Sequence, residues 1–353
     1  MKTGVIDEPL SKDEDDKLGI SEYAEALFQF IKHAETPMTV GVQGDWGSGK
    51  TSLMQQMYYK FEDPKDSLFK TKQIRVNTWE HSLLKTPQEA LVSIISKILT
   101  ELSEDFDKTR KDDIQNKVGL VLQGAFRLGM SMAGGAEGGR LAKELLHSDN
   151  SITELKESLN DAVEEISTDK YDRFIVYIDD LDRLEPANAV EILELLKNIF
   201  SIKNTVFVLA IDYNVVVKGL AKKFGALTKE NRWEYDAFFH KIIQLTFQMP
   251  VNSYDIGNYL RSLLKDIGFI KDDELEYLEE DLDKLINETI GGNPRSIKRL
   301  VNNIALNKIF ISVKDKDKTV KKIDEERERK IKFLLIALNC IQIQYPKIYE
   351  ALT

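Results

Sequence analysis

Cysteine is nearly absent from this sequence, which contains a single one, Cys340, in 353 residues. A single cysteine excludes a disulfide framework and a cysteine-rich zinc site, and we expect it inside a buried helix. The four histidines do not have the spacing of metal ligands either. The sequence therefore predicts neither a disulfide scaffold nor a zinc centre.

An excess of positive charge is also missing. The formal net charge is −10, which argues against general nucleic-acid affinity by charge alone and leaves open only a local basic face. The first residues are acidic and contain no apolar core of a signal peptide. We therefore expect a cytoplasmic protein without strong general binding to nucleic acids.

Long runs with little charge are absent except for residues 118–136, whose only charged side chain is Arg127. The length meets the lower limit for a membrane span. An arginine at the centre of a span costs about 3 kcal/mol on insertion scales, which argues against insertion. We predict that this glycine-rich insertion, at about 118–139, is a flexible hairpin or an amphipathic interaction element. Membrane insertion and glycine-rich packing without a function stay open as alternatives.

A phosphate-binding pattern, in contrast, is present. Residues 38–42 form a short apolar run typical of a buried strand, and the pattern GxxxxGK[ST] follows it. Glycines let the backbone fold tightly around phosphates with amide N–H groups pointing inward, and the N-terminus of the next helix faces the same anion. The predicted nucleotide-binding residues are Gly44, Asp45, Trp46, Gly47, Ser48, Gly49, Lys50, Thr51 and Ser52.

Two side chains of this loop have specific predicted roles. Lys50 is expected to contact the β- and γ-phosphates, and the Thr51 hydroxyl is expected to join the Mg²⁺ shell. The alternative is a glycine-rich turn that binds nothing. The apolar strand before the loop and the helical pattern after it favour the phosphate-binding interpretation.

A second apolar strand, 174–178, runs directly into Asp179 and Asp180. Burying this strand places the acids at the carboxyl edge of a sheet, where α/β folds bind ligands. We predict Asp179 as a Mg²⁺ ligand of the Walker B type and Asp180 as the general base that polarises the attacking water. A turn of solvated acids is the alternative.

Five segments resemble, in order, the KAP family of P-loop NTPases. They are Gly44-Asp-Trp-Gly-Ser-Gly-Lys-Thr51, Arg75-Val-Asn-Thr-Trp79, Ile178-Asp-Asp-Leu-Asp-Arg183 followed by Pro186, Phe238 to Leu245 ending at Pro250, and Gly292-Asn-Pro-Arg-Ser-Ile-Lys-Arg299. Many family members carry two transmembrane helices between the Walker elements, and this chain does not clearly do so. The resemblance implies signalling or conflict-type systems, including bacterial phage exclusion, and often a membrane-side location.

Three further polar residues are site candidates. Arg295, at the start of a predicted helix, suits a lid arginine that reaches back to the nucleotide; the alternative is a salt bridge within the helical domain. Arg183 is our second choice for that role, from the same chain or from a neighbouring subunit. Asp212 ends a buried strand, where it is either a polar sensor of the γ-phosphate or a helix N-cap. We also expect Trp79 to pack in the core and Ser21 to cap the first helix.

The order of elements predicts an α/β fold. Strands near 38–42, 73–77, 174–178 and 205–211 alternate with helices, and their apolar runs indicate a parallel sheet with helices on both faces. The predicted domains are a KAP-like P-loop NTPase domain, 1–251, and a smaller α-helical lid and C-terminal domain, 252–353. Within the latter, 314–330 reads as a solvated charged stretch and 331–351 as a single final helix.

The sequence thus favours a Mg²⁺-dependent, ATP-hydrolysing regulatory switch, and the resemblance implies a bacterial signalling or phage-defence system. ATP and Mg²⁺ are the predicted cofactors, and a protein partner or homo-oligomer is expected to respond to the ATP state. Two other classes stay open: a nucleotide-holding scaffold with little hydrolysis, and a small-molecule phosphotransferase. GTP is disfavoured because no Asn-Lys-x-Asp motif follows an apolar strand.

Overall fold

The computed structural model describes residues 3–12, 15–63, 69–82, 170–197, 201–271, 279–314 and 324–352, with scattered positions between 90 and 164. The chain divides into two compact units. The sheet unit consists of Ala24–Trp46 and Leu53–Met249. The helical unit consists of Met1–Tyr23, Gly47–Ser52 and Pro250–Thr353.

The sheet unit is built on five parallel strands in the order β2-β3-β4-β1-β5. Strand β4 is buried along its whole length, and β1 and β3 are buried except at their ends. Such continuous apolar strands require cover on both faces of the sheet. The strands are β1 (Met38–Gln43), β2 (Thr71–Asn77), β3 (Arg173–Asp179), β4 (Thr205–Ile211) and β5 (Leu245–Gln248).

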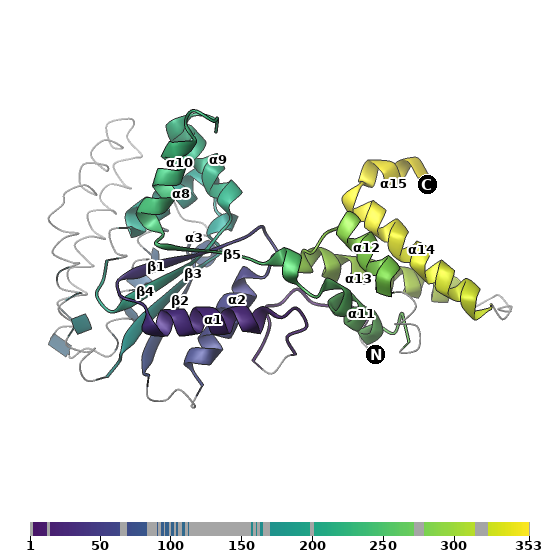
Figure 1. Ribbon diagram of the computed structural model, residues 1–353, viewed down its shortest axis with the longest axis horizontal. Helices are drawn as coiled ribbons and strands as arrows, with labels where there is room; N and C mark the ends of the chain where they lie inside the picture. Colours follow the sequence, from purple (N-terminus) through teal and green to yellow (C-terminus); the bar gives the residue numbers. More distant parts are fainter. Residues whose placement is uncertain are drawn as a thin grey trace. The chain divides into compact units, whose positions relative to one another are not determined.

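Helices supply that cover on the two faces (Figure 1). One face carries α1 (Ile20–His33) and α2 (Lys50–Phe61), whose side chains meet where the rings of Phe28 and Phe61 lie 4.6 Å apart. The other face carries α8 (Pro186–Leu196), α9 (Tyr213–Phe224) and α10 (Arg232–Ile242). The predicted α/β fold, with a parallel sheet between two helical layers, is confirmed.

Two short elements begin where strands end at the carboxyl edge of the sheet. Helix α3 (Thr78–Ser82) follows β2, and the 3-10 helix η2 (Leu181–Arg183) follows β3. Register places the last residue of β2, Asn77, opposite the last residue of β3, Asp179. This edge therefore gathers the polar residues that the sequence singles out at strand ends.

The helical unit contains η3 (Val251–Ser253), α11 (Ile256–Asp266), α12 (Glu279–Glu288), α13 (Pro294–Lys314), α14 (Glu325–Gln344) and α15 (Pro346–Leu352). Helix α13 is its central element, with buried side chains spaced for one face of a helix, namely Ile297, Leu300, Val301 and Ile304. The predicted α-helical part after the sheet is confirmed.

Several local features of the fold were not predicted correctly. Helix α14 begins at Glu325, inside the charged stretch 314–330, and its exposed side chains Glu326 and Lys330 form an i,i+4 ion pair. The predicted final helix 331–351 is two helices, since Pro346 starts a new one after Tyr345. The short strand β5 was not predicted at all.

The cap of the first helix was also assigned to the wrong residue. The carboxylate of Asp16 accepts from both the amide and the hydroxyl of Ser21, each at 2.6 Å. Ser21 therefore lies inside α1 and donates to the capping residue.

No helix in the described parts of the chain is long and apolar enough to cross a bilayer. The glycine-rich insertion 118–139 lies outside the described residues. Our prediction for the insertion therefore stays a prediction.

Candidate functional site

The loop after β1 turns sharply at two glycines. The Gly44 amide donates to the carbonyl of Ile211 at 3.2 Å, so the loop leaves the sheet beside the end of β4. Gly47 and Gly49 then adopt φ angles of +85° and +99°, where any side chain would be strained. Helix α2 begins at Lys50. This is the strand–turn–helix geometry that a phosphate-binding loop needs.

The polar groups of this loop are withdrawn from solvent. Ser48 is 1% exposed and Lys50 is 6% exposed. The buried Tyr254 hydroxyl donates to the Ser48 carbonyl at 2.9 Å, whereas Ser48 Oγ has no hydrogen-bond partner among the described residues. An unpaired buried hydroxyl costs about 1–3 kcal/mol. A buried hydroxyl donor two residues before a buried lysine fits a phosphate-bearing ligand.

The other residues of the loop are placed as follows. Thr51 and Ser52 lie in the first turn of α2, and Ser52 Oγ accepts from the Leu10 amide at 3.2 Å. Trp46 is 63% exposed. Within the loop, Ser48 and Lys50 are therefore buried, whereas Trp46 is exposed.

Asp179 and Asp180 end β3 in different environments. The Asp180 amide donates to Asp179 Oδ1 at 2.8 Å, and the Thr78 hydroxyl donates to the Asp179 carbonyl at 2.8 Å. Asp180 itself has a φ of +61°, a left-handed conformation that is uncommon outside glycine. Hydrogen bonds from the Asp180 amide and from the Thr78 hydroxyl thus fix the turn after β3.

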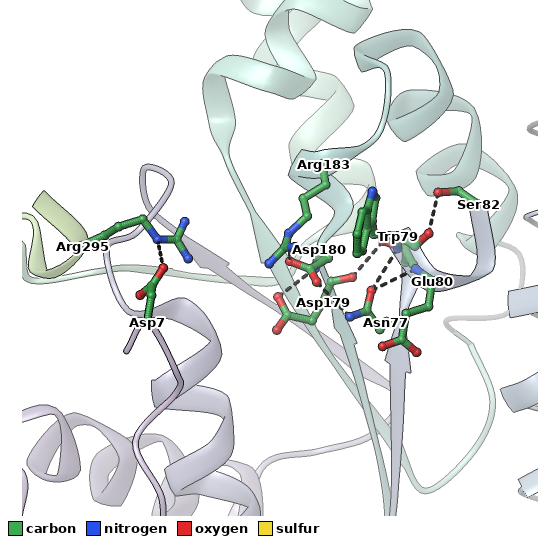
Figure 2. A network of polar contacts seen from close by, with 10 residues as sticks. Asp7, Asn77, Trp79, Glu80, Ser82, Asp179, Asp180, Arg183 and Arg295 are labelled. Carbon is green, nitrogen blue, oxygen red and sulfur yellow. Dashed lines mark hydrogen bonds and ion pairs between the residues drawn. The ribbon is translucent and has the colours of Figure 1, made fainter. Parts of the chain in front are cut away.

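Both oxygens of the Asp180 carboxylate are held (Figure 2). Asn77 Nδ2 donates to one oxygen at 2.9 Å, and Arg183 Nε pairs with the other at 2.6 Å. Burial raises the pKa of Asp180 above its ordinary value, although the charge of Arg183 and the hydrogen bond from Asn77 act to lower it. A buried carboxylate with a raised pKa is suited to proton transfer.

Asn77 also organises the start of α3. Its Oδ1 accepts from the amides of Trp79 and Glu80 at 3.1 and 3.2 Å, which satisfies two N–H groups at the helix start. Trp79 is 39% exposed, and its ring lies under the Arg183 guanidinium, 5.2 Å from the ring centre to Cζ. Our prediction that Trp79 packs in the core was wrong.

Asp212 caps a helix in the structure. Its Oδ1 accepts from the Asn214 amide at 2.9 Å at the start of α9. This contact accounts for one of the two predicted roles of Asp212; the γ-phosphate sensor stays a prediction.

Arg295 lies beside the phosphate-binding loop within the helical unit. Asn293 Oδ1 accepts from the amides of Arg295 and Ser296 and so caps α13. A Cβ atom on Gly47 would meet Arg295 Cβ at 2.7 Å and Asn293 Oδ1 at 2.8 Å. The Arg295 guanidinium is paired with the Asp7 carboxylate, as Figure 2 shows. The ion pair that the structure shows is with Asp7, which lies outside the predicted helical domain 252–353. The role of Arg295 as a lid arginine stays a prediction.

Sequence reasoning missed two residues of this region. Tyr254 and Asp7 contact the loop and Arg295 across 206 and 288 positions of the chain. Neither belongs to a motif, and no local pattern marks such a distant contact.

The profile of the KAP family P-loop domain matches residues 20–308. The chain belongs to the KAP family. Because a P-loop domain is a nucleotide-binding domain, membership assigns nucleotide binding to this KAP protein. The predicted family resemblance is confirmed.

A curated relative and two solved structures are also similar to this KAP protein. The relative is the phage T7 exclusion protein of Escherichia coli K12, 25% identical over 273 residues, which are 70% of this chain and 35% of the relative. This chain thus matches about a third of the length of that protein. The Aeropyrum pernix ORC2 protein in its ADPNP–ADP complexes gives a TM-score of 0.44 at 15% identity, covering 94% of this chain and 72% of that one. Its ADP form gives 0.40 at 12% identity, covering 93% and 70%.

Proposed function

We propose that this protein binds ATP with Mg²⁺ and hydrolyses it as a regulatory switch. The environment of the Asp180 carboxylate supports hydrolysis most directly. Burial raises its pKa, and Asn77 and Arg183 each hold one of its oxygens. A scaffold that only holds a nucleotide has no need of a base oriented in this way. Nucleotide binding rests on the loop around Gly47 and on the family.

In the proposed mechanism the loop binds the phosphates. Its backbone N–H groups and the N-terminus of α2 face the anion, and the Lys50 ammonium neutralises charge on the β- and γ-phosphates. Ser48 Oγ, which has no hydrogen-bond partner in the described part of the chain, donates to a phosphate oxygen. Thr51 and Asp179 are the residues that would hold Mg²⁺, which supplies further neutralisation of phosphate charge.

Asp180 is the proposed general base. It accepts a proton from the water that attacks the terminal phosphorus, while the bond to the leaving oxygen of ADP breaks. The hydrogen bond from Asn77 and the Arg183 ion pair hold the carboxylate ionised and oriented until that transfer. Release of the carboxylate from Arg183 is then a natural point at which a partner regulates turnover.

The name of the relative suggests the process. Since a protein 25% identical to this chain is called a phage T7 exclusion protein, we place the switch in phage defence or in a related signalling system. A protein partner or a second copy of the chain would respond to the nucleotide state. The cytoplasm is the proposed compartment, and the nucleotide-holding scaffold is the alternative function.

Two variants test the assignment together. Lys50→Ala should weaken ATP binding at least tenfold, about 1.4 kcal/mol, in a titration of the purified protein. Asp180→Asn should leave binding within about twofold and lower steady-state hydrolysis about a hundredfold or more. Asp172→Asn is the matched control for Asp180, because Asp172 precedes the same strand at its opposite end and accepts a hydrogen bond from the Lys70 amide.

The outcomes separate the two functions. ATP affinity unchanged in a folded Lys50→Ala protein would refute the binding site. If the parent protein binds ATP and Asp180→Asn hydrolyses it as fast as Asp172→Asn does, Asp180 is not the base and the scaffold function is favoured.

A further inference from the structure

The N-terminal segment 4–10 lies along the first turns of α13. The amide of Val5 donates to Asn302 Oδ1 at 2.7 Å, and Asn302 Nδ2 donates back to the Val5 carbonyl at 2.8 Å. One side-chain amide thus satisfies both backbone groups of one residue, as a neighbouring strand would. Lys298 Nζ donates to the Glu8 carbonyl at 3.1 Å, which adds a second anchor to the backbone.

The three residues of α13 that hold this segment form one face of the helix. Arg295, Lys298 and Asn302 are spaced by three and four positions, the spacing of neighbours on a helix surface. We call this face the polar strip. It offers two cations and an amide, which suits an extended acidic peptide.

Asp7 brings a carboxylate to the strip. It pairs with Arg295 Nε at 2.5 Å and lies 3.9 Å from Lys298 Nζ. The side chain of Arg295 is 26% exposed and that of Asp7 is 48% exposed. The segment then continues to the phosphate-binding loop, where the Leu10 amide donates to Ser52 Oγ. The carboxylate and the loop are therefore connected by a few residues of one docked segment.

We propose that the polar strip is the docking site of segment 4–10, and that Asp7 occupies Arg295 until a terminal phosphate displaces it. The inference rests on the proposed binding of ATP and on the role of Arg295 as the lid arginine that the sequence predicts. A phosphate carries more charge than a carboxylate and accepts more hydrogen bonds from a guanidinium. The start of α13 packs on Gly47 of the loop, which places the base of the Arg295 side chain beside the phosphate-binding loop.

The exchange makes the docked segment sensitive to the γ-phosphate. ADP has no terminal phosphate to offer Arg295 and leaves the segment docked. The γ-phosphate of ATP pairs with Arg295, which breaks the principal ion pair of Asp7 and releases the segment from the polar strip. ATP can shift this equilibrium because its contact with Arg295 differs between the docked and the released state of the protein. The segment so released is available to a partner.

Substitutions that weaken docking without touching the phosphate loop provide the test. Asp7→Asn removes the competing carboxylate and should tighten binding of a non-hydrolysable ATP analogue about two- to fivefold, as expected for a partly exposed ion pair. Asn302→Ala removes the two hydrogen bonds to the Val5 backbone at an exposed position of α13, and it should also tighten binding of the ATP analogue. Glu8→Gln is the matched control, because the Glu8 side chain has no ion-pair or hydrogen-bond partner among the described residues; its effect should stay below about 1.5-fold.

Hydrogen exchange gives a readout that does not depend on affinity. In the nucleotide-free protein the amides of Val5 and Leu10 should be protected, and Asn302→Ala should remove the protection of Val5. The ATP analogue should speed exchange at both amides, and ADP should not.

Each result decides the inference. Unchanged Val5 exchange in nucleotide-free Asn302→Ala would overturn the docking, whether or not ATP binds. If ATP binds and Asp7→Asn has the same affinity as Glu8→Gln, or a weaker one, Asp7 does not compete with the phosphate and the inference fails. If the proposed function is wrong, the parent protein does not bind ATP. No phosphate then competes with Asp7 for Arg295, and the proposed release of segment 4–10 is overturned. The exchange rate of the Val5 amide still decides whether the segment docks on the polar strip.

Discussion

Replacing Gly47 by alanine tests how closely the phosphate-binding loop packs on the start of α13. The φ angle of Gly47 is +85°, and a residue with a side chain in that region costs about 1–2 kcal/mol. The new Cβ would also lie 2.7 Å from Arg295 Cβ and 2.8 Å from Asn293 Oδ1. Neither atom is the free end of a flexible chain, since Cβ follows the backbone and Asn293 caps the helix.

The loop or the helix must therefore move. Overpacking of this kind costs about 1–3 kcal/mol, so the expected total for Gly47→Ala is about 2–5 kcal/mol of unfolding free energy. Gly291→Ala is the matched control, because Gly291 has a φ of +67° in the same unit and a Cβ there would meet nothing within 4 Å. That variant should lose only the strain, about 1–2 kcal/mol.

Urea denaturation followed by far-UV circular dichroism measures both values, and an ATP titration of each folded variant adds the functional consequence. We expect Gly47→Ala to lose at least about tenfold in ATP affinity, since the displaced loop no longer presents its amides, and Gly291→Ala to stay within about twofold. Equal destabilisation and equal ATP affinity in the two variants would refute the packing of the loop on Arg295.

Four further predictions concern the two acids after β3, the start of α13 and the carboxylate before α1. Asp179→Asn should weaken ATP binding in the presence of Mg²⁺ but not in EDTA, as isothermal titration in both buffers would reveal. Because the pKa of Asp180 is raised by burial, hydrolysis should decline on acidification at a higher pH than for an ordinary aspartate; Arg183→Gln removes the charge that opposes this rise and should move the acid limb of the kcat profile to still higher pH. ATP, and not ADP, should protect amides of residues 291–300 from exchange, which equal protection by the two nucleotides would contradict. Burial raises the pKa of Asp16, but its hydrogen bonds outweigh burial and the pKa is lowered overall; Asp16→Ala should therefore cost about 1 kcal/mol at neutral pH, a loss that shrinks as pH falls through the lowered pKa in denaturation curves.

The parts of the fold that could be predicted are those encoded by neighbouring residues. The apolar runs of β1, β3 and β4 identify buried strands because parallel strands covered on both faces need no polar positions. Strand β5 escaped prediction because it is four residues long, lies beside β1 at the edge of the described sheet and alternates partly buried with exposed positions. The first turns of α14 escaped because the charges there were read as solvation and not as i,i+4 pairs.

The candidate site divides in the same way. The glycine pattern around Gly47 and the acids after β3 could be read locally, since each needs only a strand and the turn that follows it. The surroundings of those residues could not: the partner of Arg295 is Asp7, and the partner of the Ser48 carbonyl is Tyr254. Such contacts depend on tertiary folding, which brings together residues that share no motif. The exposure of Trp79 could not be predicted either, because its ring contacts Arg183, a residue 104 positions further along the chain.

The side-chain amide of Asn77 has an oxygen that accepts hydrogen bonds and a nitrogen that donates them. Its contacts with α3 and with Asp180 are compatible with only one orientation of this group. Its oxygen faces two N–H donors of α3, so a flip would set amide hydrogens against those donors and an oxygen against the Asp180 carboxylate. A side-chain rotation therefore cannot free Asp180 without breaking the start of α3 as well. The Asn77 amide links the end of β2 to the end of β3, so a molecule that moved α3 would also disturb the hydrogen bond that holds the proposed base.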